Sequence, residues 1–141
     1  MAFVGTFEHT LDEKGRLVLP SKFRTHFVDR VYLSPGAGCI SLRTPEQFNE
    51  MVTRTREQVR AGDVQPEVLR GLASISEEVR PDGQGRITLP ARLQAFASLD
   101  RDVVLCGAID WVEIWSSSVW PDLSEAQDDA VAQAFRQGIG I

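Results

Sequence analysis

The sequence predicts a mainly β, α+β fold in which two tandem repeats share one core and short helices flank the strands. Two observations lead to this prediction. The nine residues Asp12–Pro20 return 70 positions later as Asp82–Pro90, with the same residue at five positions, which indicates an internal duplication. The chain has 141 residues, so each half would be only marginally stable alone, and we expect the halves to interlock.

The repeated unit has the chemistry of a tight turn followed by a strand. Its aspartate can accept hydrogen bonds from backbone amides of the turn, and the glycine three residues later can take a positive φ. This pattern is typical of a type I turn with a glycine bulge, which joins two antiparallel strands. The arginine after the glycine would then start the outgoing strand near the hairpin tip. These residues are Asp12, Gly15 and Arg16 in the first copy and Asp82, Gly85 and Arg86 in the second.

The first repeat, assigned to residues 5–47, is predicted to open with a strand over residues 3–11, where apolar and polar side chains alternate. The outgoing strand has Leu17 and Leu19 on one face and ends at Pro20, because proline cannot donate to a strand ladder. The second copy of the unit repeats the alternation and the final proline, so it predicts the same strand.

A short helix and a second hairpin are expected to complete the first repeat. The helix is predicted over residues 21–28, with Lys22 and Arg24 facing solvent. The hairpin strands, residues 31–33 and 39–42, flank a loop rich in glycine and proline, which is a turn signal.

Two helices are predicted to connect the repeats over residues 48–75. A capping-box pattern at Thr44, with a proline directly after it, predicts that the first helix covers residues 45–60. A shorter helix over residues 65–72 is expected to follow.

The second repeat, assigned to residues 76–119, should mirror the first. Its incoming strand is predicted over residues 73–80, and its last two strands over residues 103–106 and 111–115.

A C-terminal helix is assigned to residues 120–141. Ser116 is expected to act as its cap and Pro121 to interrupt it. A capping-box pattern at Ser124 is then expected to open a fresh helix that ends near Phe135.

The charge of the chain is unevenly distributed. The net charge of −5 argues at first sight against a nucleic-acid partner. However, residues 103–141 hold six acidic residues and one basic residue, Arg136. Residues 12–30, in contrast, carry five basic and three acidic residues. Because a polyanion responds to the local field, the region around the first turn is a candidate binding surface. No signal-peptide pattern or membrane-length apolar run is present, so a cytoplasmic location is expected.

No catalytic or metal-binding motif stands out. The sequence has no phosphate-binding glycine loop, no nucleophile elbow and no His-Glu-x-x-His pattern. Cys39 and Cys106 have no further ligand at zinc spacing and are expected to be buried, reduced thiols. His9 has no titrating companion and is expected at the edge of the core. We therefore expect no metal, no cofactor and no small-molecule substrate, and we predict that the protein is not an enzyme.

Taken together, these motifs resemble the MraZ family of bacterial transcriptional regulators. The resemblance rests on the two Asp-x-x-Gly-Arg-[Leu/Ile]-x-Leu-Pro units, the Phe-x-Gly-x-Phe start and the Lys-Phe-Arg after the first proline, and it covers nearly the whole chain. It implies an AbrB-like fold, in which swapped hairpins of two tandem repeats close one pseudo-twofold β-barrel. It also implies a ring-shaped homo-oligomer, double-stranded DNA as the partner, and control in the nucleoid of the division and cell-wall operon that contains its own gene.

The resemblance places the DNA contacts on the arginine-bearing hairpins. The implied DNA-binding residues are Asp12, Lys14, Gly15, Arg16, Asp82, Gly85 and Arg86, with Lys22 and Arg24 as secondary candidates for contacts to the DNA backbone. Gly83 and Gln84 replace Glu13 and Lys14, so the second loop is expected to bind DNA less strongly. In the opposing interpretation, each arginine merely pairs with the aspartate of its own turn. Both interpretations hold if the aspartate orients the arginine.

Two other classes of function remain open. An antitoxin-like or protein-interaction module can use the same barrel fold, and a disordered C-terminal segment that wraps a partner would identify it. The helical pattern of the last residues weakens that alternative. A small-molecule enzyme would need a pocket with convergent polar groups, and the sequence shows no sign of one. Because one chain offers few cations to DNA, we expect several protomers to bind promoter direct repeats together.

Overall fold

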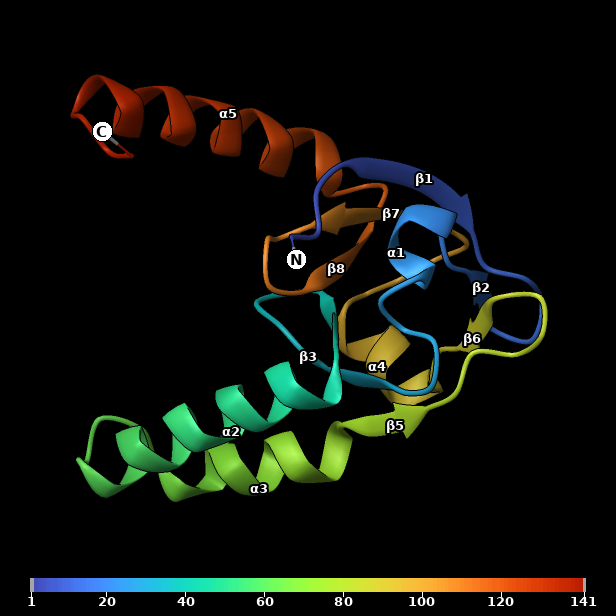
Figure 1. The fold of residues 1–141 in the computed structure, drawn as a ribbon, viewed down its shortest axis with the longest axis horizontal. Coiled ribbons are helices and arrows are strands. Elements are labelled where there is room, and N and C mark those ends of the chain that lie inside the picture. The colour runs from blue at the N-terminus through green and yellow to red at the C-terminus, as the bar shows by residue number, and fades with distance from the viewer. Residues whose placement is uncertain (1, 141) are drawn as a thin grey trace.

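The computed structural model describes residues 2–140, which form a six-stranded antiparallel sheet, a two-stranded ribbon and five helices (Figure 1). The elements in chain order are β1 (Thr6–Thr10), β2 (Arg16–Val18), α1 (Ser21–Arg24), β3 (Val31–Pro35), β4 (Ile40–Arg43), α2 (Pro45–Arg60), α3 (Pro66–Ile75), β5 (Glu77–Val79), β6 (Arg86–Thr88), α4 (Ala91–Phe96), β7 (Asp102–Gly107), β8 (Val112–Ser116) and α5 (Trp120–Arg136). The predicted α+β class is confirmed. Ile141, the last residue of the predicted C-terminal segment, lies outside the described residues.

The six-stranded sheet interleaves the two repeats. Its strand order is β1-β7-β8-β4-β3-β5, so the first strand of each repeat pairs with the third strand of the other: β1 with β7, and β5 with β3. The final hairpins of the repeats meet at the centre, where β4 pairs with β8. Since neither repeat could satisfy its backbone hydrogen bonds alone, the halves form one folding unit.

The strands that leave the repeated turns form a separate ribbon, because β2 pairs with β6. The carbonyl of Gly15 accepts a hydrogen bond from the Leu89 amide, and that of Gly85 accepts one from the Leu19 amide, both at 2.9 Å. Among the described residues, β1 pairs with β7 and β5 with β3, so neither strand that enters a repeated turn pairs with the strand that leaves it. The prediction that each turn joins two directly paired strands is therefore wrong, although both turns form.

The expected closure of the strands into one barrel is also wrong. Among the described residues, β1 and β5 remain the edges of the six-stranded sheet, and β2 and β6 pair only with each other. The ribbon strands have three residues each. Pro20 and Pro90 then follow and have no amide hydrogen to donate. The ribbon is thus too short to bond to both edges, and it packs against the sheet through side chains instead.

The core lies between the inner face of the sheet and the ribbon with its following helices. The predicted alternation is confirmed, because Leu17 and Ile87, which oppose each other across the ribbon, are 0% and 1% exposed while Val18 is 42% exposed. Phe23 of α1 and Leu93 of α4 occupy equivalent places in the two repeats and are both buried. The other large side chains that are almost fully buried are Phe3, Leu19, Phe27, Leu33, Ile40, Leu42, Leu89 and Leu105.

The connecting helices begin as predicted. The Thr44 hydroxyl accepts a hydrogen bond from the Gln47 amide, and the Gln47 side chain accepts one from the Thr44 amide, both at 3.3 Å. The capping box is therefore confirmed, and α2 covers the predicted residues. α3 continues to Ile75, because Leu72 and Ile75 extend its apolar face by one turn. The strand predicted over residues 73–80 is reduced to β5 for this reason.

α5 is one continuous helix, contrary to the break predicted at Pro121. The proline lies in the first turn, where its missing amide hydrogen has no intrahelical carbonyl to bond. Ser124 accordingly lies inside the helix, not at a new start. Ser116 ends β8, and its hydroxyl contacts that of Ser118 instead of capping a helix.

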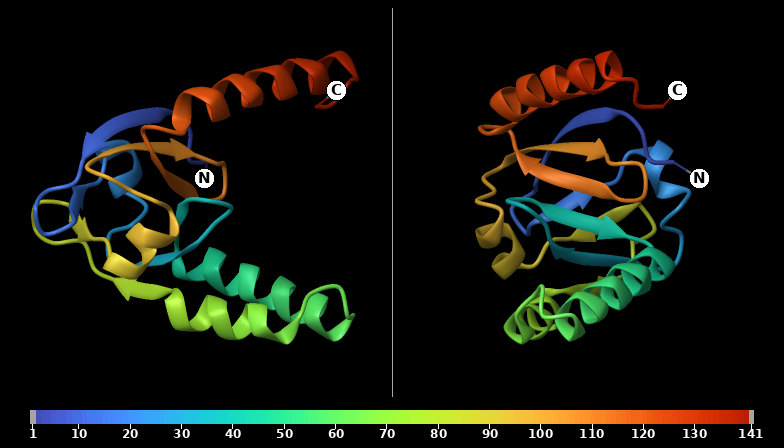
Figure 2. Two further views of the ribbon diagram at one scale, coloured as in Figure 1. Left: turned by 180° about the vertical axis from the view of Figure 1, so that it is seen from behind. Right: turned by 90° about the vertical axis from the view of Figure 1, so that its left-hand side faces the viewer.

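The repeated turns and the long helices lie at opposite ends of the molecule. In Figure 1, α2, α3 and α5 project away from the sheet on one side, while β2, β6 and their loops form the other end. Figure 2 shows the strands between α5 above and the α2–α3 pair below. Within residues 2–140, no helix combines the length and the apolar character needed to cross a membrane.

Candidate nucleic-acid interface

An aspartate closes the first repeated turn. Asp12 Oδ1 accepts hydrogen bonds from the amides of Lys14 and Arg16 at 2.9 and 2.8 Å, and Oδ2 accepts one from Arg16 Nε at 2.6 Å. The Gly15 amide donates to the Asp12 carbonyl at 3.0 Å, and Gly15 has a φ of +73°. Because residues with a Cβ rarely adopt that φ, the turn requires glycine at this position.

The second turn has the same geometry. Asp82 Oδ1 accepts hydrogen bonds from the amides of Gln84 and Arg86, both at 2.9 Å, and Oδ2 accepts one from Arg86 Nε at 2.7 Å. Gly85 has a φ of +74°. The turn chemistry predicted from the repeated unit is therefore confirmed in both copies.

The same hydrogen bonds keep the two aspartates ionised. The backbone amide of Arg86, followed by its side chain, lowers the pKa of Asp82 to about 2. The backbone amide of Arg16 is the main cause that lowers the pKa of Asp12. Both aspartates thus carry a negative charge at neutral pH, and each holds its arginine by a charge-assisted hydrogen bond.

Each aspartate engages only the Nε edge of its arginine. In the part of the chain that the structure describes, the Nη1 and Nη2 atoms of Arg16 and Arg86 donate no hydrogen bond to the protein. The two side chains keep 31% and 28% of their surface exposed. The pairing and binding interpretations are therefore compatible. The aspartate fixes the direction of the guanidinium group, and the outer donors stay available to an anionic partner.

The ribbon brings both arginines onto one surface. In its register, Arg16 opposes Thr88 and Arg86 opposes Val18. Directly opposed side chains share a face of a β-ribbon, so these four lie on the face away from the buried pair at the ribbon centre. Diagonal neighbours on such a face are roughly 7–8 Å apart. We call this surface, made of Arg16, Val18, Arg86 and Thr88, the arginine ribbon.

Contrary to the prediction, Arg24 does not face solvent. Its Nη2 donates to the Leu19 carbonyl at 2.8 Å, and its guanidinium group lies against Gly85, in the turn of the other repeat. Its Nε is buried without a hydrogen-bond partner. A cation from the first repeat therefore lies behind the second turn. In the loop of this turn, Gln84 stands where the first turn has Lys14.

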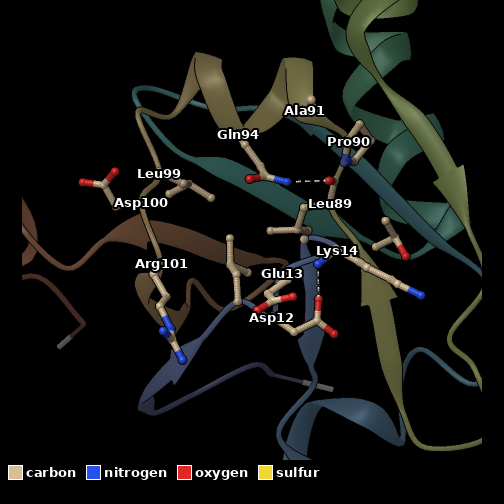
Figure 3. Close-up of a pocket in the computed structure, with 13 residues that line it drawn as sticks. Asp12, Glu13, Lys14, Leu89, Pro90, Ala91, Gln94, Leu99, Asp100 and Arg101 are labelled. Carbon is tan, nitrogen blue, oxygen red and sulfur yellow. Dashed lines mark hydrogen bonds between the residues drawn. The ribbon is translucent and has the colours of Figure 1, made fainter.

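Gln94 makes the equivalent contact in the first turn (Figure 3). It extends from α4 and donates from Nε2 to the Leu89 carbonyl at 2.8 Å, and it lies against Gly15. Sequence reasoning missed this residue. The repeat alignment could have found it, because Gln94 lies 70 positions after Arg24.

The remaining predicted cations lie on exposed surface. Lys14 borders a surface pocket of about 760 Å³ beside the first turn, which Glu13, Asp100 and Arg101 also line (Figure 3). Because these charges have both signs, the pocket itself does not favour an anion. Lys22 lies on the exposed side of α1, as predicted.

Three titratable groups outside the turns, His9, Cys39 and Cys106, lie in the surroundings expected from the sequence. Across residues 2–140, no group of three or more His, Cys, Asp and Glu side chains could hold a metal ion. His9 is half-buried at the edge of the core, and desolvation lowers its pKa. Cys39 and Cys106 are buried free thiols, as predicted, and burial raises their pKa to about 12 and about 11. Reactive thiolates are thus disfavoured at both positions.

The sequence matches the protein family described as "MraZ protein, putative antitoxin-like" over residues 2–65 and again over residues 72–139. It is 34% identical over 139 residues to the transcriptional regulator MraZ of Nocardia farcinica, covering 98% of this chain and 97% of that protein. The MraZ regulator of Corynebacterium diphtheriae is 35% identical over 141 residues, with the same coverage. That of Cutibacterium acnes is 38% identical over 135 residues, or 92% of each chain. These matches include both repeated turns.

Proposed function

Because the chain belongs to the MraZ family, we propose that it is a sequence-specific transcriptional regulator that binds double-stranded DNA through the arginine ribbon and has no catalytic activity. The relatives described above are named transcriptional regulators. We further propose that it acts in the nucleoid on the promoter of the division and cell-wall operon that holds its own gene, as the family resemblance implies.

One observation carries the proposal: Arg16 and Arg86 lie on the same exposed two-stranded ribbon. The major groove of B-DNA admits such a ribbon, and arginine can donate two hydrogen bonds to guanine or to a phosphate. The aspartate of each turn holds its arginine through Nε, so the outer donors point in a defined direction before DNA arrives. Less side-chain entropy is then lost on binding.

The cations of one chain are too few for tight binding. Arg16, Arg86, Lys14 and one helix residue such as Lys22 would neutralise about four phosphates, which supports only non-specific affinity at physiological salt. We therefore propose that several protomers, arranged as a ring, present their arginine ribbons to direct repeats in the promoter, so that weak contacts add. The acidic helix α5 projects away from the ribbon (Figure 1), which keeps its charge from the DNA.

The strand exchange supports the proposed AbrB-like relationship of the repeats. The first strand of each repeat pairs with a strand of the other repeat, and the ribbon pairs β2 of the first repeat with β6 of the second. Swapped hairpins of AbrB type would produce such a pairing within one chain.

Substitution of the arginines tests the DNA contact. Arg16→Ala should weaken binding to DNA from upstream of the protein's own gene by about 5- to 150-fold, since a direct base contact contributes about 1–3 kcal/mol. Arg86→Ala should also weaken it, and Arg70→Ala, which removes the same charge from α3, should not. Fluorescence anisotropy gives the affinities, and circular-dichroism melts should be unchanged. If Arg16→Ala bound DNA as tightly as Arg70→Ala, Arg16 would not contact the DNA. If Arg16→Ala lost its cooperative thermal melt, the arginine would be needed for the fold.

Probes with one, two and three direct repeats test the assembly. Affinity should rise steeply with the number of repeats, and the slope of log K against log salt should grow by a few units for each repeat engaged. Equal affinities and equal slopes for all probes would show instead that each chain has one self-sufficient site.

An antitoxin-like role is the alternative function, and the description of the matched family favours its consideration. A module of that kind would bind a partner protein through its C-terminal segment. In this chain that segment is the regular helix α5, not an extended strand that wraps a partner. DNA binding that survives both arginine substitutions, together with a stable complex formed by α5 with an unrelated protein, would favour this alternative.

A further inference from the structure

The arginine ribbon is nearly twofold symmetric, but its two ends differ in one side chain. At one end Arg16 opposes Thr88. At the other end Arg86 opposes Val18. The repeat alignment places Val18 and Thr88 at equivalent positions, 70 residues apart. Each end therefore offers an arginine, and the residue beside that arginine is apolar at one end and carries a hydroxyl group at the other.

Val18 is exposed although the fold does not require an apolar side chain at its position. It is 42% exposed, and the equivalent residue of β6, Thr88, is exposed too. Threonine and valine both favour β-strands. A threonine would therefore suit the strand at position 18 as well, without placing an apolar group in water. Because Val18 lies on the surface proposed to bind DNA, its apolar group is a candidate for contact with a base edge.

The charges around the two ends have both signs and do not distinguish them. Glu8 and Asp102 line a surface recess of about 650 Å³ that also includes Val18. Arg24 lies against the turn at the same end. The pocket beside the other end holds acidic and basic side chains as well. The difference between an isopropyl group and a hydroxyl group, in contrast, is one that a base edge can distinguish.

The spacing of the ribbon matches that of neighbouring base pairs. Directly opposed residues have Cβ atoms about 4.5–5.5 Å apart, and successive nucleotides of B-DNA are about 3.4 Å apart along the axis. If Arg86 bonds to a guanine in the major groove, Val18 reaches the edge of an adjacent base pair. The apolar group on such an edge is the methyl group of thymine.

Valine and threonine place different demands on that base pair. Valine packs well against a methyl group but leaves the amino group of adenine or cytosine without a hydrogen-bond partner, which costs free energy. Threonine can form a hydrogen bond with any of the bases. The end with Val18 should therefore select thymine, and the end with Thr88 should tolerate several bases.

We propose that Val18 determines specificity by packing against a thymine methyl group in the base pair next to the guanine that Arg86 contacts. The inference rests on the function proposed above, because it names what the same surface reads. A ribbon with two identical ends would match a palindrome and bind it in either orientation. The difference between Val18 and Thr88 instead fixes one orientation, which suits direct repeats because all of their sites point the same way.

Replacement of single thymines by uracil tests the methyl contact, because uracil lacks only that methyl group. Each thymine of one repeat in the DNA upstream of the protein's own gene is replaced in turn, and fluorescence anisotropy gives the affinity. At one position uracil should weaken binding by about fourfold, the effect of one buried methyl group. Val18→Ser, which removes the isopropyl group, should bind the thymine and uracil probes equally at that position. Val28→Ser changes a valine that is 80% exposed and lies outside the ribbon, so it should behave as the parent.

Thr88→Val tests the fixed orientation. The probe for this test carries a second thymine at the mirrored position, beside the guanine that Arg16 would contact. The parent should bind it as tightly as the natural DNA, whereas Thr88→Val should bind it about fourfold more tightly. Circular-dichroism melts should be unchanged in each variant, because the substituted side chains are exposed. Val18→Thr keeps the shape of valine and is the second variant. It should tolerate cytosine in place of the selected thymine better than the parent does.

The opposite results would overturn the inference. These are a parent that uracil weakens at no position, or a Val18→Ser variant that uracil weakens as much as the parent at the same position. A Val18→Thr variant that rejects cytosine as strongly as the parent would also overturn it. A parent that gains from the second thymine would show that Thr88 selects thymine too, so that this pair does not fix the orientation.

The arginine variants separate this inference from the proposed function. If Arg16→Ala and Arg86→Ala lose DNA binding but the uracil scan does not depend on Val18, the inference alone is refuted. If the parent binds no DNA, or binds it equally well without both arginines, the proposed function is refuted and this inference with it.

Discussion

Replacement of Gly85 by alanine tests how tightly the two repeats are locked at the turns. Gly85 has a φ of +74°, a region that costs a residue with a Cβ about 1–2 kcal/mol. The added Cβ would also overlap the Arg24 guanidinium group, which must then move away. Arg24 would lose its hydrogen bond to the Leu19 carbonyl, and a bond of this charged type contributes about 1.5–3 kcal/mol.

The expected loss of stability for Gly85→Ala is the sum of these two costs, reduced by a smaller effect of alanine on the unfolded chain. Alanine restricts the unfolded chain more than glycine does, which offsets about 0.4–1 kcal/mol. The free energy of unfolding should therefore fall by about 3 kcal/mol. Urea denaturation, followed by the fluorescence of the three tryptophans, measures this change.

Gly62→Ala is the matched control for the backbone contribution. Gly62 has a φ of +80°, and nothing lies within 4 Å of the position its Cβ would occupy. Its substitution should cost only about 1 kcal/mol. If the two variants lost the same stability, Arg24 would not be held against Gly85, and the crossed contact would contribute nothing to the fold.

Three further predictions concern the core, the turns and the thiols. Leu17→Ala should lower the free energy of unfolding by about 2–5 kcal/mol in urea denaturation, and the loss should not add fully to that of Ile87→Ala, because the two side chains oppose each other. A loss below 1 kcal/mol would contradict the burial. The pKa of Asp82 lies at about 2 in the fold against an ordinary 3.8, so its stabilising contribution is complete above about pH 4 and is lost as the pH falls toward 2. Thermal melts should therefore show the stability gap between the parent and Asp82→Asn closing over that range, and a constant gap would refute the role of the carboxylate. Cys39 and Cys106, with raised pKa values and buried sulfurs, should resist a thiol reagent near pH 8 and react after unfolding in guanidinium. Rapid labelling of the native protein would show that the strands around them open.

The sequence by itself determined the features that depend on a few neighbouring residues. The turns at Asp12 and Asp82 follow from an aspartate that bonds to amides two and four residues later and a glycine with positive φ. The start of α2 follows from the capping box at Thr44. The buried positions in the ribbon follow from alternation with period two. In each case the atoms that interact lie close together in the chain, so their spacing is visible before folding.

Only the tertiary structure decided which strands pair and on which surface the charged side chains lie. The turn at Asp12 would allow β2 to pair with β1, but β2 pairs with β6, and the carbonyls of Gly15 and Gly85 extend that pairing by bonding to amides of the other repeat. That pairing moves two arginines, 70 positions apart, onto one surface and folds Arg24 behind the second turn. Among the described residues, it also leaves β1 and β5 as the edges of the six-stranded sheet. Such outcomes depend on backbone and side-chain groups that meet only after the two halves have folded around each other, and no local pattern encodes them.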